Sequence, residues 1–246
     1  MSKLRSFSAP AHVVVAGANG GIGSALVDAL LDDPRVGRVT ALSRKPSDRQ
    51  HERLHSATID FADEASIAQA AADCGDNIDL VIVATGILHR EPDIRPEKRL
   101  ADVDGPTLAE VLHINTIGPA LLAKHFLPRL RRDAKSAFAP ISARVGSISD
   151  NRLGGWASYR ASKAALNMLM RTFSIEQART NPQSLIVTLH PGTTDTALSK
   201  PFQRNVPEGK LFEPAFVAER LLAVLDGLAP GDSGGFFAWD ASRIEY

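Results

Sequence analysis

The sequence predicts an α/β fold in which a doubly wound parallel sheet is covered by helices on both faces. Short apolar runs alternate with segments of helical periodicity along the whole chain. A glycine-rich turn joins the first apolar run to the first periodic segment. With 246 residues, 44% of them hydrophobic, the chain can bury one sizeable core. We therefore expect a single domain over residues 1–246, with ligands bound at the carboxyl ends of the strands.

Each element follows from the spacing of apolar residues. Residues 1–11 are expected to form a loose lead-in and residues 88–105 a long loop. Pro106 favours the first turn of a long helix because its fixed φ suits that position. Strands are expected where the apolar runs are short, at 12–16, 36–42, 54–59, 78–84, 137–142, 185–189 and 235–239. Helices are expected where apolar residues recur at helical spacing, at 22–31, 64–72, from 106 towards 131, 156–179 and 215–228.

Composition excludes several classes of function. Lys plus Arg number 28, as do Asp plus Glu, so the overall charge favours neither nucleic acid nor an anionic membrane as a partner. Cys74 is the only cysteine, which excludes an internal disulfide and a multi-cysteine metal site. His51 and His55 fall in a predicted loop and strand, and we expect no metal. No apolar stretch is long enough for a signal peptide or a membrane span, which favours a cytoplasmic protein.

The glycine-rich turn over residues 17–23 follows the first predicted strand and has the spacing G-x-x-x-G-x-G. Glycines let the backbone approach a phosphate closely, and the next helix offers its free N-terminal N–H groups to the anion. The spacing differs from the G-x-G-x-x-G of many dinucleotide-binding folds. Taken alone, the pattern is equally consistent with a tight turn that binds no ligand.

A second pattern, Tyr159-x-x-x-Lys163, lies in a predicted helix. Residues four apart share one helix face, so the phenol and the ammonium are neighbours. A free tyrosine has a pKa of about 10, and a nearby ammonium favours the phenolate. Lys163 could thereby tune Tyr159 into a general acid/base. The alternative is a surface pair that shares a helix face without any chemistry.

In this order, the two patterns resemble the short-chain dehydrogenase/reductase family, and the resemblance extends from the first strand to Trp239. It implies a Rossmann-type fold, a nicotinamide cofactor, and reduction of an aldehyde or ketone to an alcohol, with Tyr159 as proton donor. It also implies that Lys163 bonds the nicotinamide ribose and that Asn115 holds a water for proton relay, although an amide capping a helix irregularity is the alternative for Asn115. A homodimer or homotetramer through the two long helices is expected. The residues that would bind the cofactor are Gly17, Asn19, Gly21, Ile22, Gly23, Asp60, Ala84, Gly86, Tyr159, Lys163, Pro191, Gly192 and Thr194.

The residues after the second strand bear on the choice of cofactor. An acid there would bond the adenosine ribose and disfavour a 2′-phosphate, but this chain has Ser43, Arg44 and Lys45. Two cations suit the extra phosphate of NADP, and a guanidinium can bind phosphate bidentately. Lys45 is equally consistent with an ordinary solvated loop charge. NADP is therefore the preferred cofactor, and NAD remains the alternative.

The serine pattern departs from the family. Most members have a Ser three residues before a Gly and thirteen before the Tyr, but Ala143 stands three before Gly146 and Ser142 stands seventeen before Tyr159. The longer spacing also occurs in C-factor-like proteins and sniffer-type carbonyl reductases, which the stretches 142–147 and 191–196 resemble. Ser142 is the preferred catalytic serine, and Ser147 is the other candidate hydroxyl.

The substrate is less well specified by the sequence than the cofactor. Residues 194–213 contain prolines and mixed polarity, which suits a mobile lid over a small-molecule substrate. Leu88, Trp156, Leu198 and Phe202 would line an apolar pocket that favours carbonyl compounds with hydrophobic groups. The competing hypothesis is a C-factor-like signalling or regulatory protein that binds NAD(P) without needing turnover.

Overall fold

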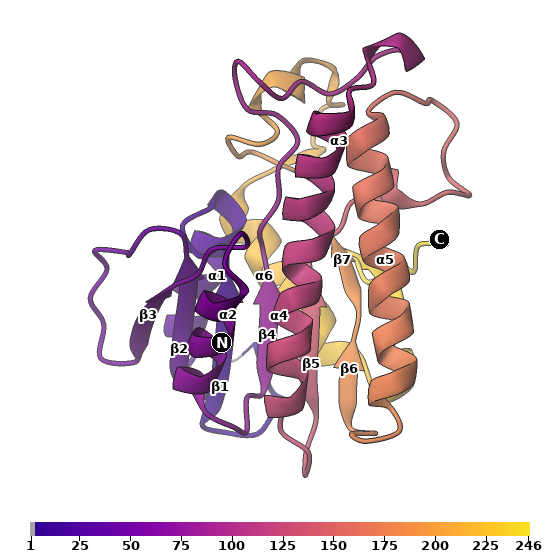
Figure 1. Ribbon diagram of the computed structural model, residues 1–246. Helices are drawn as coiled ribbons and strands as arrows, with labels where there is room; N and C mark the ends of the chain where they lie inside the picture. Colours follow the sequence, from indigo (N-terminus) through magenta and orange to yellow (C-terminus); the bar gives the residue numbers. More distant parts are fainter. Residues whose placement is uncertain (1–2) are drawn as a thin grey trace.

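The computed structural model describes residues 3–246 and contains a central sheet of six parallel strands between two layers of helices (Figure 1). Its strands are β1 (Ala11–Ala16), β2 (Val36–Ser43), β3 (Leu54–Thr58), β4 (Leu80–Val83), β5 (Ser136–Pro140) and β6 (Ser184–Ile186). Their order is β3-β2-β1-β4-β5-β6, so the winding direction reverses beside β1. Ligands of such sheets bind at the carboxyl ends of the strands near this reversal. The glycine-rich turn follows β1 directly.

Four short strands form two separate parallel pairs outside the six-stranded sheet. The run predicted at 185–189 is divided at Val187, because β6 pairs with β5 whereas β7 (Thr188–His190) pairs with β10 (Phe236–Ala238). A separate parallel pair, β8 (Thr193–Thr194) and β9 (Leu211–Phe212), lies at the two ends of the segment that was expected to be a lid. Both ends of that segment are therefore tied together.

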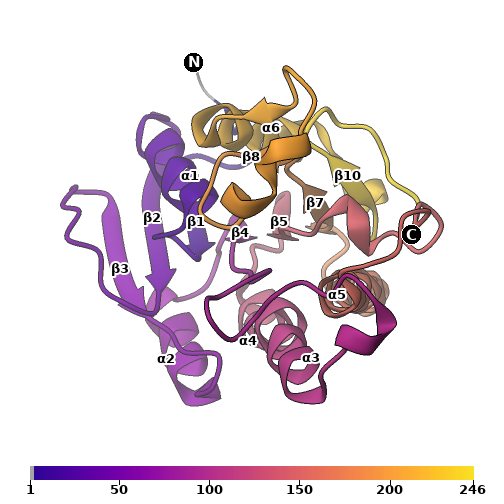
Figure 2. The same cartoon turned by 90° about the horizontal axis from the view of Figure 1, so that it is seen from above.

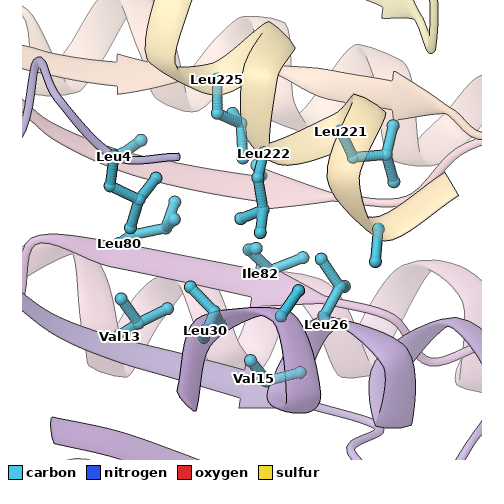
Figure 3. Close-up of a cluster of buried hydrophobic side chains, with 14 of the residues drawn as sticks. Leu4, Val13, Val15, Leu26, Leu30, Leu80, Ile82, Leu221, Leu222 and Leu225 are labelled. Atoms are coloured by element: carbon cyan, nitrogen blue, oxygen red, sulfur yellow. The ribbon is translucent and has the colours of Figure 1, made fainter. Parts of the chain in front are cut away.

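Two helical layers bury the two faces of the sheet. Helices α1 (Gly21–Leu31) and α6 (Pro214–Gly227) cover one face, while α2 (Glu64–Cys74), α4 (Gly118–Phe126) and α5 (Ala157–Gln177) cover the other (Figure 2). Because both faces are covered, β4 at the centre of the sheet is apolar and buried at every position, whereas the edge strand β3 is largely exposed. No helix within residues 3–246 combines the length and apolarity needed to span a bilayer. The core beside α1 and α6 includes Val13, Val15, Leu26, Leu30, Leu80, Ile82, Leu221, Leu222 and Leu225 (Figure 3).

The expected loose lead-in is wrong for the part of it that the structure describes; residues 1 and 2 lie outside the described residues. Leu4 and Phe7 are buried in the core beside α1 and α6. The backbone N–H groups of Lys3 and Leu4 donate to the Asp33 carboxylate, and the Arg35 guanidinium donates to the carbonyls of Leu4 and Phe7. Burial of Leu4 and Phe7, together with these hydrogen bonds, docks the N-terminal segment onto the core.

The long helix predicted from Pro106 is interrupted. It consists of α3 (Gly105–Leu112), a π-helical turn (His113–Ile117) and α4, followed by a 3₁₀ turn (Leu127–Arg129). Pro119 has no N–H to donate to the carbonyl of Asn115, four residues earlier, so the regular α-helical ladder cannot continue there. The Gly118 N–H instead reaches the carbonyl of His113, which is the wider spacing of a π turn. This turn projects Asn115 towards the carboxyl edge of the sheet.

Candidate active site

Two glycines of the 17–23 turn occupy positions that no side chain could share. Gly17 has φ +82°, and a Cβ there would lie 2.8 Å from the carbonyl carbon of Ala84 at the end of β4. A Cβ at Gly23 would overlap the carbonyl oxygen of Gly17. The Gly20 N–H donates to that same carbonyl at 2.9 Å and closes the turn. The backbone is thus brought directly to the ends of β1 and β4, where a phosphate could approach it.

Helix α1 begins at Gly21, and its first turn has no side-chain cap. The first N–H groups of an uncapped helix, here those of Gly21 and Ile22, are available to an anion. Asn19 does not face this position: its Nδ2 donates to the carbonyl of Lys45 at 2.9 Å. That bond fastens the glycine-rich turn to the loop after β2, so Asn19 positions the two cations next to the turn.

The two cations after β2 are exposed and free of ion pairs. Within residues 3–246, neither Arg44 nor Lys45 has a carboxylate partner, whereas Arg49 in the same loop pairs with Asp28 at 2.9 Å. Asp60 lies after β3 with one carboxylate oxygen occupied by the Ala62 N–H at 2.9 Å. Arg44 and Lys45 therefore form the uncompensated positive charge beside the glycine-rich turn.

Helix α5 places Tyr159 and Lys163 in the interior below the carboxyl edge. Tyr159 is 9% exposed and Lys163 is 3% exposed. The Lys163 ammonium donates to the carbonyl of Ile141 at 2.9 Å and lies 5.8 Å from the centre of the Tyr159 ring. Lys163 therefore meets the end of β5, and Tyr159 lies next to it on the same helix face, as their spacing predicted.

Burial sets the protonation of this pair. It raises the pKa of Tyr159 to about 12 and lowers the pKa of Lys163 to about 8. The expectation that Lys163 lowers the pKa of Tyr159 is therefore wrong for this structure, because desolvation of the phenol raises it. At neutral pH, Tyr159 holds its proton and Lys163 is mostly charged, which suits donation of a proton from the phenol.

The π turn fastens the loop after β4 to α5. Asn115 Oδ1 accepts the Ile87 N–H at 2.7 Å, and its Nδ2 donates to the Ile87 carbonyl at 2.8 Å and to Ser162 Oγ at 3.0 Å. Thr116 Oγ1 donates to the Ser162 carbonyl at 2.8 Å. A Cβ at Gly86 would lie 3.4 Å from Asn115 Oδ1 and 3.6 Å from the Lys163 ammonium, so these groups converge there. Sequence reasoning missed Thr116 and Ser162; Pro119 was the available signal for the turn.

The two candidate serines differ in their surroundings. Ser142 follows β5, and its buried Oγ has no hydrogen-bond partner among the described residues. Ser147 Oγ accepts the Asp150 N–H at 3.2 Å and lies 3.2 Å from Ser149 Oγ. The hydroxyl of Ser147 is therefore engaged within its own loop. Ser142 adjoins Ile141, whose carbonyl holds Lys163, and it carries the hydroxyl that still needs a partner.

Residues 194–213 form a folded arm across the carboxyl edge of the sheet (Figure 2). Phe202, in a 3₁₀ turn of this arm, packs against Trp156 and His89 with ring centres 5.0 and 5.6 Å apart. The Trp156 ring in turn lies 6.3 Å from the Tyr159 ring. The structure thus brings Phe202 and Trp156 together over Tyr159, and an aromatic wall encloses this side of the site.

The remaining predicted positions lie along the same edge. Gly192, with φ +74°, packs against Phe212 of β9, directly after Pro191. Thr194 Oγ1 is buried and has no partner within residues 3–246. Leu198 is half-buried in the arm, and Leu88 is buried and lines a crevice with Tyr159. The described residues contain no group of three or more His, Cys, Asp or Glu side chains that could hold a metal ion.

Several known proteins resemble this chain in sequence or in fold. A family model for short chain dehydrogenases matches residues 11–207. The C-signal protein of Myxococcus xanthus is 36% identical over 148 residues, which cover 60% of this chain and 83% of that protein. The NADPH-bound carbonyl reductase from chicken fatty liver has a TM-score of 0.82 at 30% identity, covering 96% of this chain and 98% of its own. The carbonyl reductase Sniffer of Drosophila melanogaster also has a TM-score of 0.82, at 22% identity over 96% of this chain and 99% of its own, which concerns the fold alone.

The family match therefore covers the glycine-rich turn, the π turn and the helix that carries Tyr159 and Lys163. It ends within the arm that closes over them. From its first strand to that arm, the chain belongs to the short-chain dehydrogenase/reductase family.

Proposed function

We propose that this protein reduces an aldehyde or ketone to an alcohol with NADPH as the reductant. The observation that carries the proposal is a buried, protonated Tyr159 on the same sheet edge as a glycine-rich turn that no side chain could fill. A proton donor and a backbone surface open to a pyrophosphate are the two things that this reaction needs from a protein.

The residues present fit a dinucleotide. Gly17 and Gly23 leave the backbone bare at the carboxyl ends of β1 and β4, and the first turn of α1 is uncapped. Arg44 and Lys45, which have no acidic partner among the described residues, would take the 2′-phosphate that distinguishes NADPH from NADH. Thr194, whose buried hydroxyl has no partner in that part of the chain, would contact the nicotinamide end. The bound nucleotide would supply the hydride.

The chain's own residues would handle the proton and hold the substrate. Tyr159 gives its proton to the carbonyl oxygen as that oxygen becomes an alkoxide, which is easier beside the charged Lys163. Ser142 Oγ, which bonds to none of residues 3–246, would donate a hydrogen bond to the same oxygen. Trp156 and Phe202 provide an apolar aromatic wall, which favours carbonyl compounds with hydrophobic groups.

A fluorescence titration with NADPH and, separately, NADH tests the cofactor assignment. Replacing Arg44 and Lys45 together with Ala should weaken NADPH binding much more than NADH binding. Arg49→Ala is the matched control, because Arg49 is an exposed cation of the same loop whose partner is Asp28. Equal losses for both nucleotides in the double variant would contradict a role in phosphate binding.

The similarity to C-signal favours one alternative: a signalling protein that binds NAD(P) without needing turnover. The two proposals differ in what they require of Tyr159. Under the enzyme proposal, Tyr159→Phe abolishes carbonyl reduction and leaves NADPH binding nearly intact, because the phenol oxygen is the proton donor. A biological effect of the protein that survives Tyr159→Phe would favour the signalling proposal.

A further inference from the structure

Glu97 is a buried carboxylate to which the proposed reaction gives no role. It lies in the 88–105 loop and is 5% exposed, whereas Glu91 in the same loop forms an exposed ion pair with Arg95 at 2.9 Å. Burying a carboxylate is costly unless hydrogen bonds replace its water. The partners of Glu97 therefore indicate what the buried group does.

Within residues 3–246, the hydrogen bonds of Glu97 go to the beginning of α5. The Trp156 N–H donates to the Glu97 backbone carbonyl at 2.6 Å. The Ser158 N–H donates to the two carboxylate oxygens at 3.3 and 3.2 Å, and the Ser158 hydroxyl donates to one of them. Trp156 itself, with φ +54°, provides no side-chain cap. Glu97 thus caps α5 from a distant segment, and its negative charge also suits the helix N-terminus.

The two residues bonded to Glu97, Trp156 and Ser158, lie just before the proton donor in the chain. Ser158 precedes Tyr159 directly, and the Trp156 ring packs edge-on to the Tyr159 ring. Glu97, Ser158 and Tyr159 line one narrow crevice. Without this cap, the first N–H groups of α5 would be unpaired and the first turn of the helix could fray. Fraying would loosen the Tyr159 phenol, which lies in that turn.

We propose that Glu97 is a positioning residue that fixes the Tyr159 phenol and the Trp156 ring by capping α5 from the substrate-side loop. The catalytic consequence rests on the proposed function, whereas the capping role does not. Through Glu97, the loop that follows β4 and the helix that carries the proton donor are held as one unit.

Kinetics of Glu97 variants test the catalytic consequence. Glu97→Ala should lower kcat per bound NADPH by at least about tenfold, since small misplacements of a reacting group cost this much. NADPH affinity should stay unchanged, because the glycine-rich turn lies on other elements. Glu97→Gln keeps an acceptor for the Ser158 N–H and should recover most of kcat. Glu91→Ala, the matched control on the same loop, should leave kcat and NADPH affinity as in the wild type.

Hydrogen exchange of the segment containing Ser158 tests the cap without any turnover. Glu97→Ala should speed exchange of this amide, while Glu97→Gln and Glu91→Ala should not. If the wild type reduces no carbonyl compound but Glu97→Ala still speeds exchange, the proposed function fails and the cap stands. If exchange accelerates while kcat per bound NADPH is unchanged, the positioning role is overturned.

If Glu97→Ala fails to fold, Glu97→Asp tests the positioning role instead. This variant keeps the charge but withdraws the carboxylate by one methylene. A lower kcat with unchanged NADPH affinity would support the positioning role. An unchanged kcat with faster exchange at Ser158 would overturn it.

Discussion

Lys163→Met should abolish carbonyl reduction and yet leave the protein as stable as the wild type or more so. Burial lowers the pKa of Lys163 from 10.5 to about 8. At about 1.4 kcal/mol for each tenfold change in proton affinity, the charged ammonium costs about 3 kcal/mol of folding free energy at neutral pH. The penalty is fully present below pH 8 and shrinks as the pH rises towards 10.5, because the folded state prefers the neutral amine.

The net gain is smaller than this penalty because the Ile141 carbonyl loses its donor. A buried unpaired carbonyl costs about 1–3 kcal/mol, so the expected change is a gain of about 0–2 kcal/mol. Urea unfolding at neutral pH, followed by circular dichroism, measures it. A loss of more than about 1 kcal/mol would refute the reasoning that desolvation dominates at this site.

Lys135→Met is the control for that measurement. The pKa of Lys135 is also lowered to about 8, chiefly by desolvation. Its ammonium, however, donates to three backbone carbonyls at the end of α6 and to a hydroxyl in the N-terminal segment. Removing it should destabilise the protein by about 2 kcal/mol or more, since several acceptors lose their donor together. The opposite signs of the two Lys→Met changes would separate desolvation from hydrogen bonding.

Three further predictions follow from the same geometry. The rate of carbonyl reduction should fall about tenfold between pH 7 and 9 as Lys163, with its pKa near 8, loses its proton; a Lys163→Arg variant that retains activity should show no such fall. Gly23→Ala should abolish NADPH binding in a titration, because the added methyl overlaps the Gly17 carbonyl and opens the turn. Leu4→Ala should lower the free energy of unfolding by about 2–5 kcal/mol in urea, which a loose lead-in would not show.

Much of the fold could be predicted from the sequence because its signals are local. Apolar runs of strand length and helical spacing reflect burial on two faces, and the structure confirms them. The docking of Leu4 could not be predicted, since it depends on Asp33 and Arg35, which only the fold brings near. The π turn was missed although Pro119 marks it, because the apolar periodicity continues across it and predicts one helix.

In the candidate site, too, residues linked by a local sequence pattern could be predicted, and residues brought together only by the fold could not. Tyr159 and Lys163 were found because they share a helix face and match the family pattern, and the structure buries both and bonds Lys163 to the end of β5. Glu97 was missed because its partners lie about sixty residues away in the chain and no local pattern links them. The pKa of Tyr159 was misjudged, since the sequence shows its charged neighbour but not the depth of its burial.

The most direct test of the account is NADPH oxidation by the wild type and by Tyr159→Phe, with a panel of hydrophobic aldehydes and ketones. We expect turnover by the wild type and none by the variant, while both proteins bind NADPH with similar affinity. Substantial turnover by Tyr159→Phe would contradict the role of the phenol as proton donor.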